Sequence, residues 1–185
     1  MHSPPNTNII LCMKRFYSGS GDDGFTGLLG EDRVPKSHPQ PEAYGSVDEA
    51  SAALGMAQAI SDSKEVDSLV KEIQADLYKA MAELAATPDH HQEFQQLSEG
   101  RVEWLEEQIQ KYSRTIQIPN TFVLFGDSKG GAAFDMARTI VRRAERAVVK
   151  LNLEGDIKYG VVMKYLNRLS SLCFVLSLRE AQSDK

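Results

Sequence analysis

A set of arginines in the second half of the chain has the spacing of a phosphate-binding helix face. Arg138, Arg142 and Glu145 stand at i, i+4 and i+7, so in a helix they lie along one face, with Arg143 and Arg146 beside it. A guanidinium offers five donors in a rigid fork that matches phosphate oxygens. The pattern therefore indicates a site for a polyphosphate and its counter-ion. The alternative is a surface helix whose arginines form ion pairs with neighbouring acids.

The charge of the chain is unevenly distributed. Residues 138–150 contain five basic residues and one acid, a local charge of +4, whereas the whole chain carries −5, which leaves −9 on the remainder. Acidic surface elsewhere would repel an extended phosphate backbone. The composition therefore argues against a nucleic-acid partner and favours phosphates on a small molecule.

A second candidate anion-binding element is the glycine-rich segment 18–27. It holds four glycines and three hydroxyl side chains in ten residues, so backbone N–H groups can turn toward an anion while the hydroxyls donate to it. Lys36 follows nearby and adds a point charge. The segment matches neither the Walker pattern nor a calcium-binding loop. A bare flexible turn is the alternative interpretation.

Two further side chains stand where chemistry or packing could use them. Asn167 falls in an apolar stripe, where an amide needs hydrogen-bond partners, and a core hydrogen bond is the alternative to a ligand contact. Phe122, in a short apolar segment, is either a core anchor or a ligand contact. The four histidines are scattered without Cys or acid at metal-ligand spacing, so we expect no metal site built from protein ligands.

Hydrophobic periodicity predicts an all-α protein with one up-and-down bundle of five helices. The predicted helices span residues 41–60, 63–86, 92–112, 132–153 and 157–179. Residues 121–125 have no partner strand and are expected to form an apolar loop. Residues 17–40 are expected to form an ordered or orderable loop that belongs to a single domain spanning 17–185, preceded by a flexible leader at 1–16.

The composition also bounds the location of the protein. No run approaches about 18 consecutive apolar residues, and the leader places its basic residues after its short apolar piece, unlike a secretory signal. The two cysteines form no disulfide framework. We therefore expect a cytoplasmic protein without a membrane span.

Four motifs in order resemble the PduO-type ATP:cob(I)alamin adenosyltransferases, over about residues 17–179. The motifs are GDDGFT at 21–26, EAYGSVDE at 42–49, ART and RRAER at 137–139 and 142–146, and YLNRLS at 165–170. Four motifs in the correct order are far more specific than any one of them. The resemblance implies a ferritin-like five-helix bundle that forms a homotrimer with active sites at the subunit interfaces.

The resemblance also assigns roles to individual residues. The loop that folds over ATP corresponds to Ser18, Gly19, Ser20, Gly21, Thr26 and Gly27, with Lys36 as the phosphate-contacting lysine. The remaining nucleotide positions correspond to Arg142, Arg143, Ala144, Glu145, Arg146 and Asn167. Arg138 and Asp48 resemble an ion pair between neighbouring subunits that shapes the catalytic site together with Arg142. Phe122 corresponds to the aromatic residue that packs against the lower face of the corrin.

The reaction implied by the resemblance moves the 5′-deoxyadenosyl group of ATP to the cobalt of reduced cob(I)alamin or cob(I)yrinic acid a,c-diamide. It releases triphosphate, uses Mg²⁺ bound to the phosphates, and belongs to vitamin B12 biosynthesis. A reductase and an adenosylcobalamin-dependent enzyme are the implied partners. The alternatives are a non-catalytic module that binds or delivers the nucleotide or corrinoid, and a structural bundle whose arginines pair with its own acids.

Two segments depart from the pattern of that family. Ser18-Gly19-Ser20 stands where Thr-Lys-Thr is usual, which removes a lysine charge from the loop. Phe125-Gly126-Asp127 stands where Pro-Gly-Gly or Pro-Ser-Gly is usual, which places a carboxylate near the expected corrin pocket. The departures bear on nucleotide affinity and on corrin access.

Overall fold

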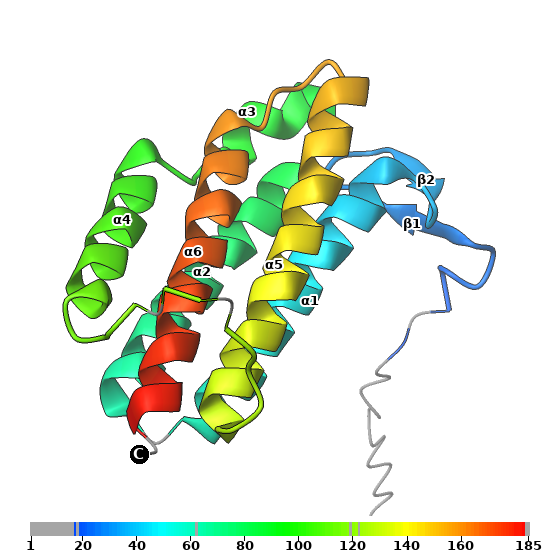
Figure 1. The fold of residues 1–185 in the computed structure, drawn as a ribbon. Helices are drawn as coiled ribbons and strands as arrows, with labels where there is room; N and C mark the ends of the chain where they lie inside the picture. Colours follow the sequence, from blue (N-terminus) through cyan, green and yellow to red (C-terminus); the bar gives the residue numbers. More distant parts are fainter. Residues whose placement is uncertain (1–16, 18, 62, 119, 122, 184–185) are drawn as a thin grey trace, which may run out of the picture.

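The fold is a bundle of long helices with a small β-hairpin at one end (Figure 1). The computed structural model describes residue 17 and residues 19–61, 63–118, 120–121 and 123–183. The leader at 1–16, Ser18 and Phe122 therefore lie outside the described residues. The helices are α1 (Pro39–Ile60), α2 (Lys64–Ala85), α3 (His91–Phe94), α4 (Glu99–Ser113), α5 (Lys129–Glu154) and α6 (Gly160–Ser183), with a 3₁₀ turn at Pro88–His90.

Capping side chains fix where the long helices begin. His38 Nδ1 accepts a hydrogen bond from the backbone N–H of Gln40, and Pro39 occupies the first turn of α1. The hydroxyl of Ser128 accepts from the N–H of Gly131 at 3.0 Å, so α5 begins at residue 129, three residues before the predicted start. Four of the five predicted helices are thus confirmed, with shifts of up to four residues at their ends.

The third predicted helix, 92–112, is wrong as a single element. The described residues contain six α-helices because the four-residue α3 is separated from α4 by a non-helical segment at 95–98. Leu97 and Val102 are both buried but stand five residues apart, a spacing that would direct them to different faces of one helix. The break lets both side chains reach the core.

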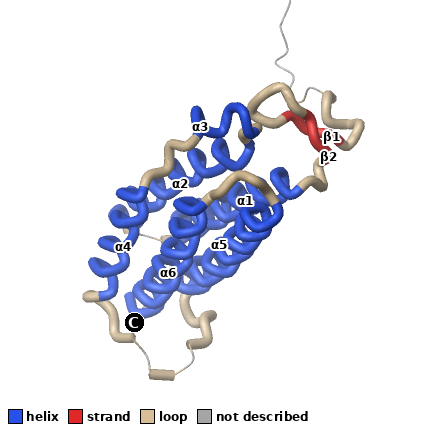
Figure 2. The backbone as a smooth tube through the Cα atoms, turned by 90° about the horizontal axis from the view of Figure 1, so that it is seen from above, coloured by secondary structure: helices blue, strands red, loops and turns tan. Residues whose placement is uncertain are grey.

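The core lies between α1, α2, α5 and α6, and α4 packs against α6 and adds Val102, Leu105 and Tyr112 to the core (Figure 2). Apolar residues at helical spacing fill it, including Leu54, Ile73, Phe134 and Leu169, each fully buried. Residues 121 and 123–125 form a loop, as expected. Helix α6 is long and apolar enough to cross a membrane, but 61% of its most apolar window is buried within the bundle, as in core helices.

A buried polar cluster ties three helices together. Asp76 on α2 is 2% exposed and accepts from Arg101 Nε on α4 at 2.6 Å and from the Tyr165 hydroxyl on α6 at 3.0 Å. Burial of the phenol, together with the nearby carboxylate, raises the pKa of Tyr165 strongly. The hydroxyl therefore remains a donor to Asp76.

The segment before α1 contains a hairpin that the sequence analysis did not predict. It contains two antiparallel strands, β1 (Phe25–Gly27) and β2 (Arg33–Pro35), with Thr26 opposite Val34. The turn of this hairpin is attached to the end of α2. Leu29 N–H donates to the carbonyl of Ala85 at 2.8 Å, and Thr87 N–H donates to the carbonyl of Leu29 at 3.0 Å. The loop is therefore a fixed attachment of the bundle.

Candidate nucleotide and corrin site

The predicted arginine face lies on α5, which packs between α1 and α6 (Figure 1). Arg138 Nε donates to Asp135 on the same helix at 2.8 Å, and Arg143 forms an ion pair with Glu49 of α1. Arg142 and Arg146 are exposed, and neither forms an ion pair with another described residue. Two of the four guanidiniums therefore remain available to an anion.

Two neighbouring positions of the predicted site differ in character. Ala144 is fully buried, so its side chain is part of the core. Glu145 is half-buried, and its Oε1 accepts from Nδ2 of Asn167 on α6 at 2.9 Å. The expectation that Asn167 faces the apolar interior is wrong, because its side chain is exposed beside α5. The amide and the carboxylate are brought together at the edge of the arginine face.

The glycine-rich loop is held in shape by a pair of side chains that the sequence analysis did not single out. Arg33 donates to both carboxylate oxygens of Asp23, at 3.0 and 3.1 Å, and to the carbonyl of Ser20 at 2.7 Å. The carboxylate also accepts from the N–H of Phe25 at 3.1 Å. Arg33 and this N–H hold the pKa of Asp23 below its usual range. The Asp-Asp-Gly sequence followed by an arginine ten residues later was the available signal.

Glycine is required at two turns of this loop. Gly19 and Gly24 have φ angles of 75° and 84°, in the left-handed region that other residues rarely adopt. Lys36 lies against Gly21, where an added Cβ would stand 3.1 Å from the lysine Nζ. The structure thus brings the predicted lysine onto the predicted loop. Gly27 ends β1 and Thr26 is half-buried within it.

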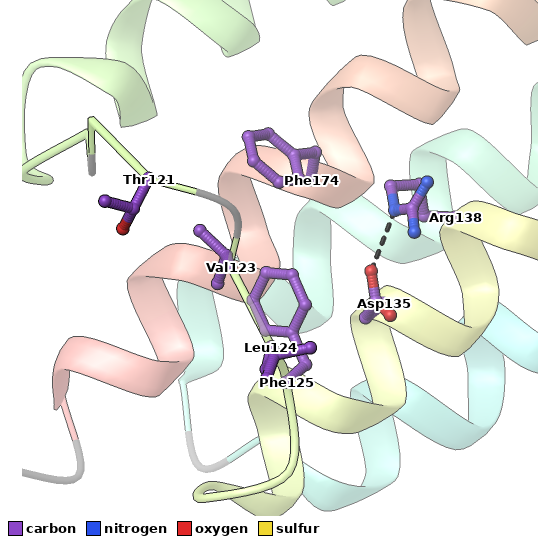
Figure 3. A pocket seen from close by; sticks show the side chains of 7 residues that line it. All are labelled: Thr121, Val123, Leu124, Phe125, Asp135, Arg138 and Phe174. Atoms are coloured by element: carbon purple, nitrogen blue, oxygen red, sulfur yellow. Dashed lines mark hydrogen bonds and ion pairs between the residues drawn. The ribbon is translucent and has the colours of Figure 1, made fainter.

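A cavity of about 550 Å³ opens at the Arg138 end of the arginine face (Figure 3). Its lining comes from the apolar loop (Thr121, Val123, Leu124, Phe125), from α5 (Asp135, Arg138) and from Phe174 on α6. The rings of Phe125 and Phe174 meet edge to face, with centroids 6.1 Å apart. Phe122 lies outside the described residues, but its neighbours on both sides line this cavity.

Neither Asp48 nor Asp127 lines that cavity. Asp48 is exposed on α1 and forms no ion pair with a described residue of its own chain. Asp127 lines two other spaces, beside Ser128 at the start of α5. No group of three or more His, Cys, Asp and Glu within the described ranges is placed to hold a metal ion.

The comparison with protein families agrees with the resemblance of the motifs. The family model described as cobalamin adenosyltransferase matches residues 16–180. The chain belongs to this family. Among the curated relatives of this chain, the corrinoid adenosyltransferase of Mycobacterium leprae is 34% identical over 176 residues. The match covers 91% of this chain and 92% of the relative. Corrinoid adenosyltransferase PduO of Citrobacter freundii is 34% identical over 165 residues.

The chain spans about half the length of that PduO relative, 49%, while 89% of the chain is matched. Solved structures of the family superpose over almost the whole chain. A variant of the PduO-type ATP:corrinoid adenosyltransferase from Lactobacillus reuteri, complexed with ATP, has a TM-score of 0.84 and 32% identity, covering 91% of this chain and 95% of that one. Another variant from the same organism, complexed with cobalamin and ATP, has a TM-score of 0.84 and 30% identity, with 92% and 95% coverage.

The two halves of the candidate site differ in chemistry. The arginine face and the glycine loop offer positive charge and N–H donors, which suit phosphates. The cavity beside Phe125 and Phe174 offers apolar surface, which suits a flat macrocycle. In the described part of one chain no ion pair joins the loop to the arginine face.

Proposed function

We propose that this protein transfers the 5′-deoxyadenosyl group of ATP to the cobalt of reduced cob(I)alamin, giving adenosylcobalamin and triphosphate. The observation that carries the proposal is the pair of exposed guanidiniums, Arg142 and Arg146, that no described acid neutralises, beside the Glu145–Asn167 pair. Its support is membership of the cobalamin adenosyltransferase family and the resemblance to proteins solved with ATP and cobalamin.

The reaction asks little covalent chemistry of the protein. The electron pair of cobalt(I) forms the new bond to the 5′ carbon, and the bond from this carbon to the triphosphate oxygen breaks. The protein must align these atoms and stabilise the charge that develops on the departing triphosphate. Fixed guanidiniums on a rigid helix suit that task. Cobalt(I) is the nucleophile, so no activated Ser or His is required.

The loop at 17–40 is proposed to enclose the nucleotide. Its residues would donate from backbone N–H groups and hydroxyls to the phosphates, with Lys36 supplying a positive charge. The proposed loop contacts are Ser18, Gly19, Ser20, Gly21, Thr26 and Gly27. Mg²⁺ would enter as the counter-ion of the phosphates, with the carboxylate of Glu145 as the nearest acid on the arginine face. Residues 17–185 would act as one domain.

The cavity lined by Phe125 and Phe174 is proposed to receive the corrin. Phe122 would approach the lower face of the ring and exclude the lower axial ligand, which makes the cobalt easier to reduce. Asp127 borders neighbouring spaces rather than this cavity. One of these spaces shares Val123, Leu124 and Phe125 with the cavity, so the Asp127 carboxylate lies next to the proposed corrin site without lining it.

A homotrimer would bring the two halves of the site together. An apolar groove of about 590 Å³ runs between α1 and α5, lined by residues from Glu49 to Ile60 and from Lys129 to Ile140. Met56 and Met136 in this groove are 65% and 62% exposed. Methionine side chains adapt to irregular partner surfaces. In such a trimer Asp48 would pair with Arg138 of a neighbouring subunit. A cytoplasmic location, with a reductase as electron donor, completes the proposal.

An anaerobic assay tests the proposed function. Purified protein is mixed with reduced cobalamin, ATP and Mg²⁺, and the absorbance change of cobalt–carbon bond formation is followed together with triphosphate release. We expect equal amounts of adenosylcobalamin and triphosphate. ATP-dependent stabilisation without product would instead identify a binding or delivery module. Absence of both would refute a nucleotide site.

A further inference from the structure

A continuous chain of hydrogen bonds crosses three helices beside the arginine face. On α4, Glu106 Oε1 accepts from Arg168 Nε at 2.7 Å. On α6, a terminal nitrogen of Arg168 donates to Asn167 Oδ1 at 2.9 Å. Asn167 Nδ2 then donates to Glu145 Oε1 on α5 at 2.9 Å. Glu106 and Arg168, which begin this series of hydrogen bonds, have no assigned role in the candidate site.

The direction of these bonds determines the orientation of the amide. With Oδ1 toward Arg168 and Nδ2 toward Glu145, each amide atom faces a complementary group. Rotation by 180° would place the NH₂ group against a guanidinium and the oxygen against a carboxylate. Both contacts would then be repulsive. One orientation is therefore selected, and it directs a donor at Glu145.

The Glu106–Arg168 ion pair adds little stability by itself, because its side chains are 44% and 40% exposed, respectively. Its effect is geometric. A guanidinium that donates through Nε to one residue and through a terminal nitrogen to another has a defined position. Arg168 is held from α4, and it in turn holds Asn167.

We propose that Arg168, held by Glu106, is a positioning residue that orients the Asn167 amide and thereby the Glu145 carboxylate for the nucleotide. The inference rests on the proposed function, since it deepens the assignment of Asn167 and Glu145 to ATP. Without Arg168 the amide keeps only its contact to Glu145, so the orientation of both side chains is less well defined. Because the Asn167 and Glu145 side chains are already oriented before ATP binds, binding loses less side-chain entropy.

A double-mutant cycle on ATP binding separates positioning from direct contact. Calorimetric titration of Mg-ATP, without corrinoid, measures affinity for the unaltered protein, Arg168→Met, Asn167→Ala and the double variant. We expect Arg168→Met to weaken ATP binding on the order of tenfold in the unaltered background. In the Asn167→Ala background the same change should have less than about a twofold effect. Equal losses in both backgrounds would overturn the proposal, as would no loss in either.

Two further variants test the role of α4 in this series of hydrogen bonds. Glu106→Gln keeps an oxygen that accepts from Arg168 Nε and should retain ATP affinity, whereas Glu106→Ala should lose part of it. Loss in both variants would overturn the role of Glu106. The matched control is Lys164→Met, which removes another exposed α4–α6 ion pair, to Glu99 at 2.7 Å. This variant should bind ATP normally, and weakened binding would attribute the Arg168 effect to helix packing.

The titration also distinguishes this inference from the proposed function. If the unaltered protein binds ATP but forms no adenosylcobalamin, the proposed transferase activity is refuted. The double-mutant cycle on ATP affinity still tests the role of Arg168. Unaltered protein that does not bind ATP would overturn both. Circular dichroism and thermal unfolding of each variant verify that the bundle is intact.

Discussion

A buried carboxylate at the end of α2 gives the protein a pH-dependent stability that can be calculated. Glu83 is 1% exposed, and its Oε1 lies 3.6 Å from Nε2 of His91, whose side chain is 12% exposed. Glu83 Oε2 and His91 Nε2 have no hydrogen-bond partner among the described residues. Burial raises the pKa of Glu83 from 4.5 to about 7 and lowers the pKa of His91 from 6.5. The Tyr159 ring packs edge to face on His91.

The sign of the effect follows from proton linkage. The folded protein retains the Glu83 proton at pH values where the unfolded chain has lost it, so this group stabilises the fold fully below pH 4.5. Its contribution is lost as the pH rises through about 7. The change in proton affinity corresponds to about 3 kcal/mol, at about 1.4 kcal/mol for each tenfold step. His91 is neutral at this pH and does not compensate the carboxylate charge.

Glu83→Gln removes the ionisation and keeps the shape of the side chain. The free energy of unfolding of the variant, relative to the unaltered protein, should rise by about 3 kcal/mol between pH 4.5 and 8. For a chain of this length the melting-temperature difference should grow by about 6–12 °C.

The assay is denaturant or thermal unfolding at fixed protein concentration across the pH range. The matched control is Glu107→Gln, which makes the same change at an exposed position of α4. A difference between Glu83→Gln and the unaltered protein that stays constant with pH would refute the reasoning. So would an equal pH dependence in the control variant.

Three further predictions concern the proposed site. Arg142→Ala should abolish adenosylcobalamin formation while circular dichroism and sedimentation stay unchanged, and near-normal turnover would contradict the site assignment. Asp48→Asn should weaken assembly or misorder the site because, in the proposed trimer, Arg138 of a neighbouring subunit would lose its partner; unchanged sedimentation and kinetics would contradict it. Arg33→Met should raise the KM for ATP several-fold with little change in melting temperature, since it frees the loop from the half-exposed Asp23. An unchanged KM would exclude this role.

Helix positions were predictable from the sequence because burial imposes a period on apolar residues. The positions of α1, α2, α5 and α6 follow from that period, and their ends follow from capping residues such as Ser63 and Ser128. The break before α4 was missed, although the five-residue spacing of Leu97 and Val102 contained the signal. A window that averages over the whole segment hides one irregular interval.

The site was predictable in its residue types but less so in its contacts. Arginines spaced by four residues lie together on any helix, so the arginine face required only the helix itself. The Asp23–Arg33 pair depends on the turn of a hairpin that the sequence does not define by periodicity. The contact between Asn167 and Glu145 depends on the rotation of α6 against α5, which is decided by core packing. Long-range packing therefore determined what local pattern could not.

The ion pairs on α5 determine which guanidiniums of the arginine face are available to an anion. Glu49 and Asp135 neutralise two of its guanidiniums within the chain. Arg142 and Arg146 stand one turn apart without a described acidic partner in an ion pair, and like charges at this spacing destabilise a helix. An anion placed between them removes that repulsion, so binding and helix stability are coupled. Mg-ATP at about 100 times its dissociation constant should stabilise the protein by about 2.7 kcal/mol. Arg142→Ala relieves the same repulsion in the free protein, so its melting temperature should rise slightly without ATP and respond less to it.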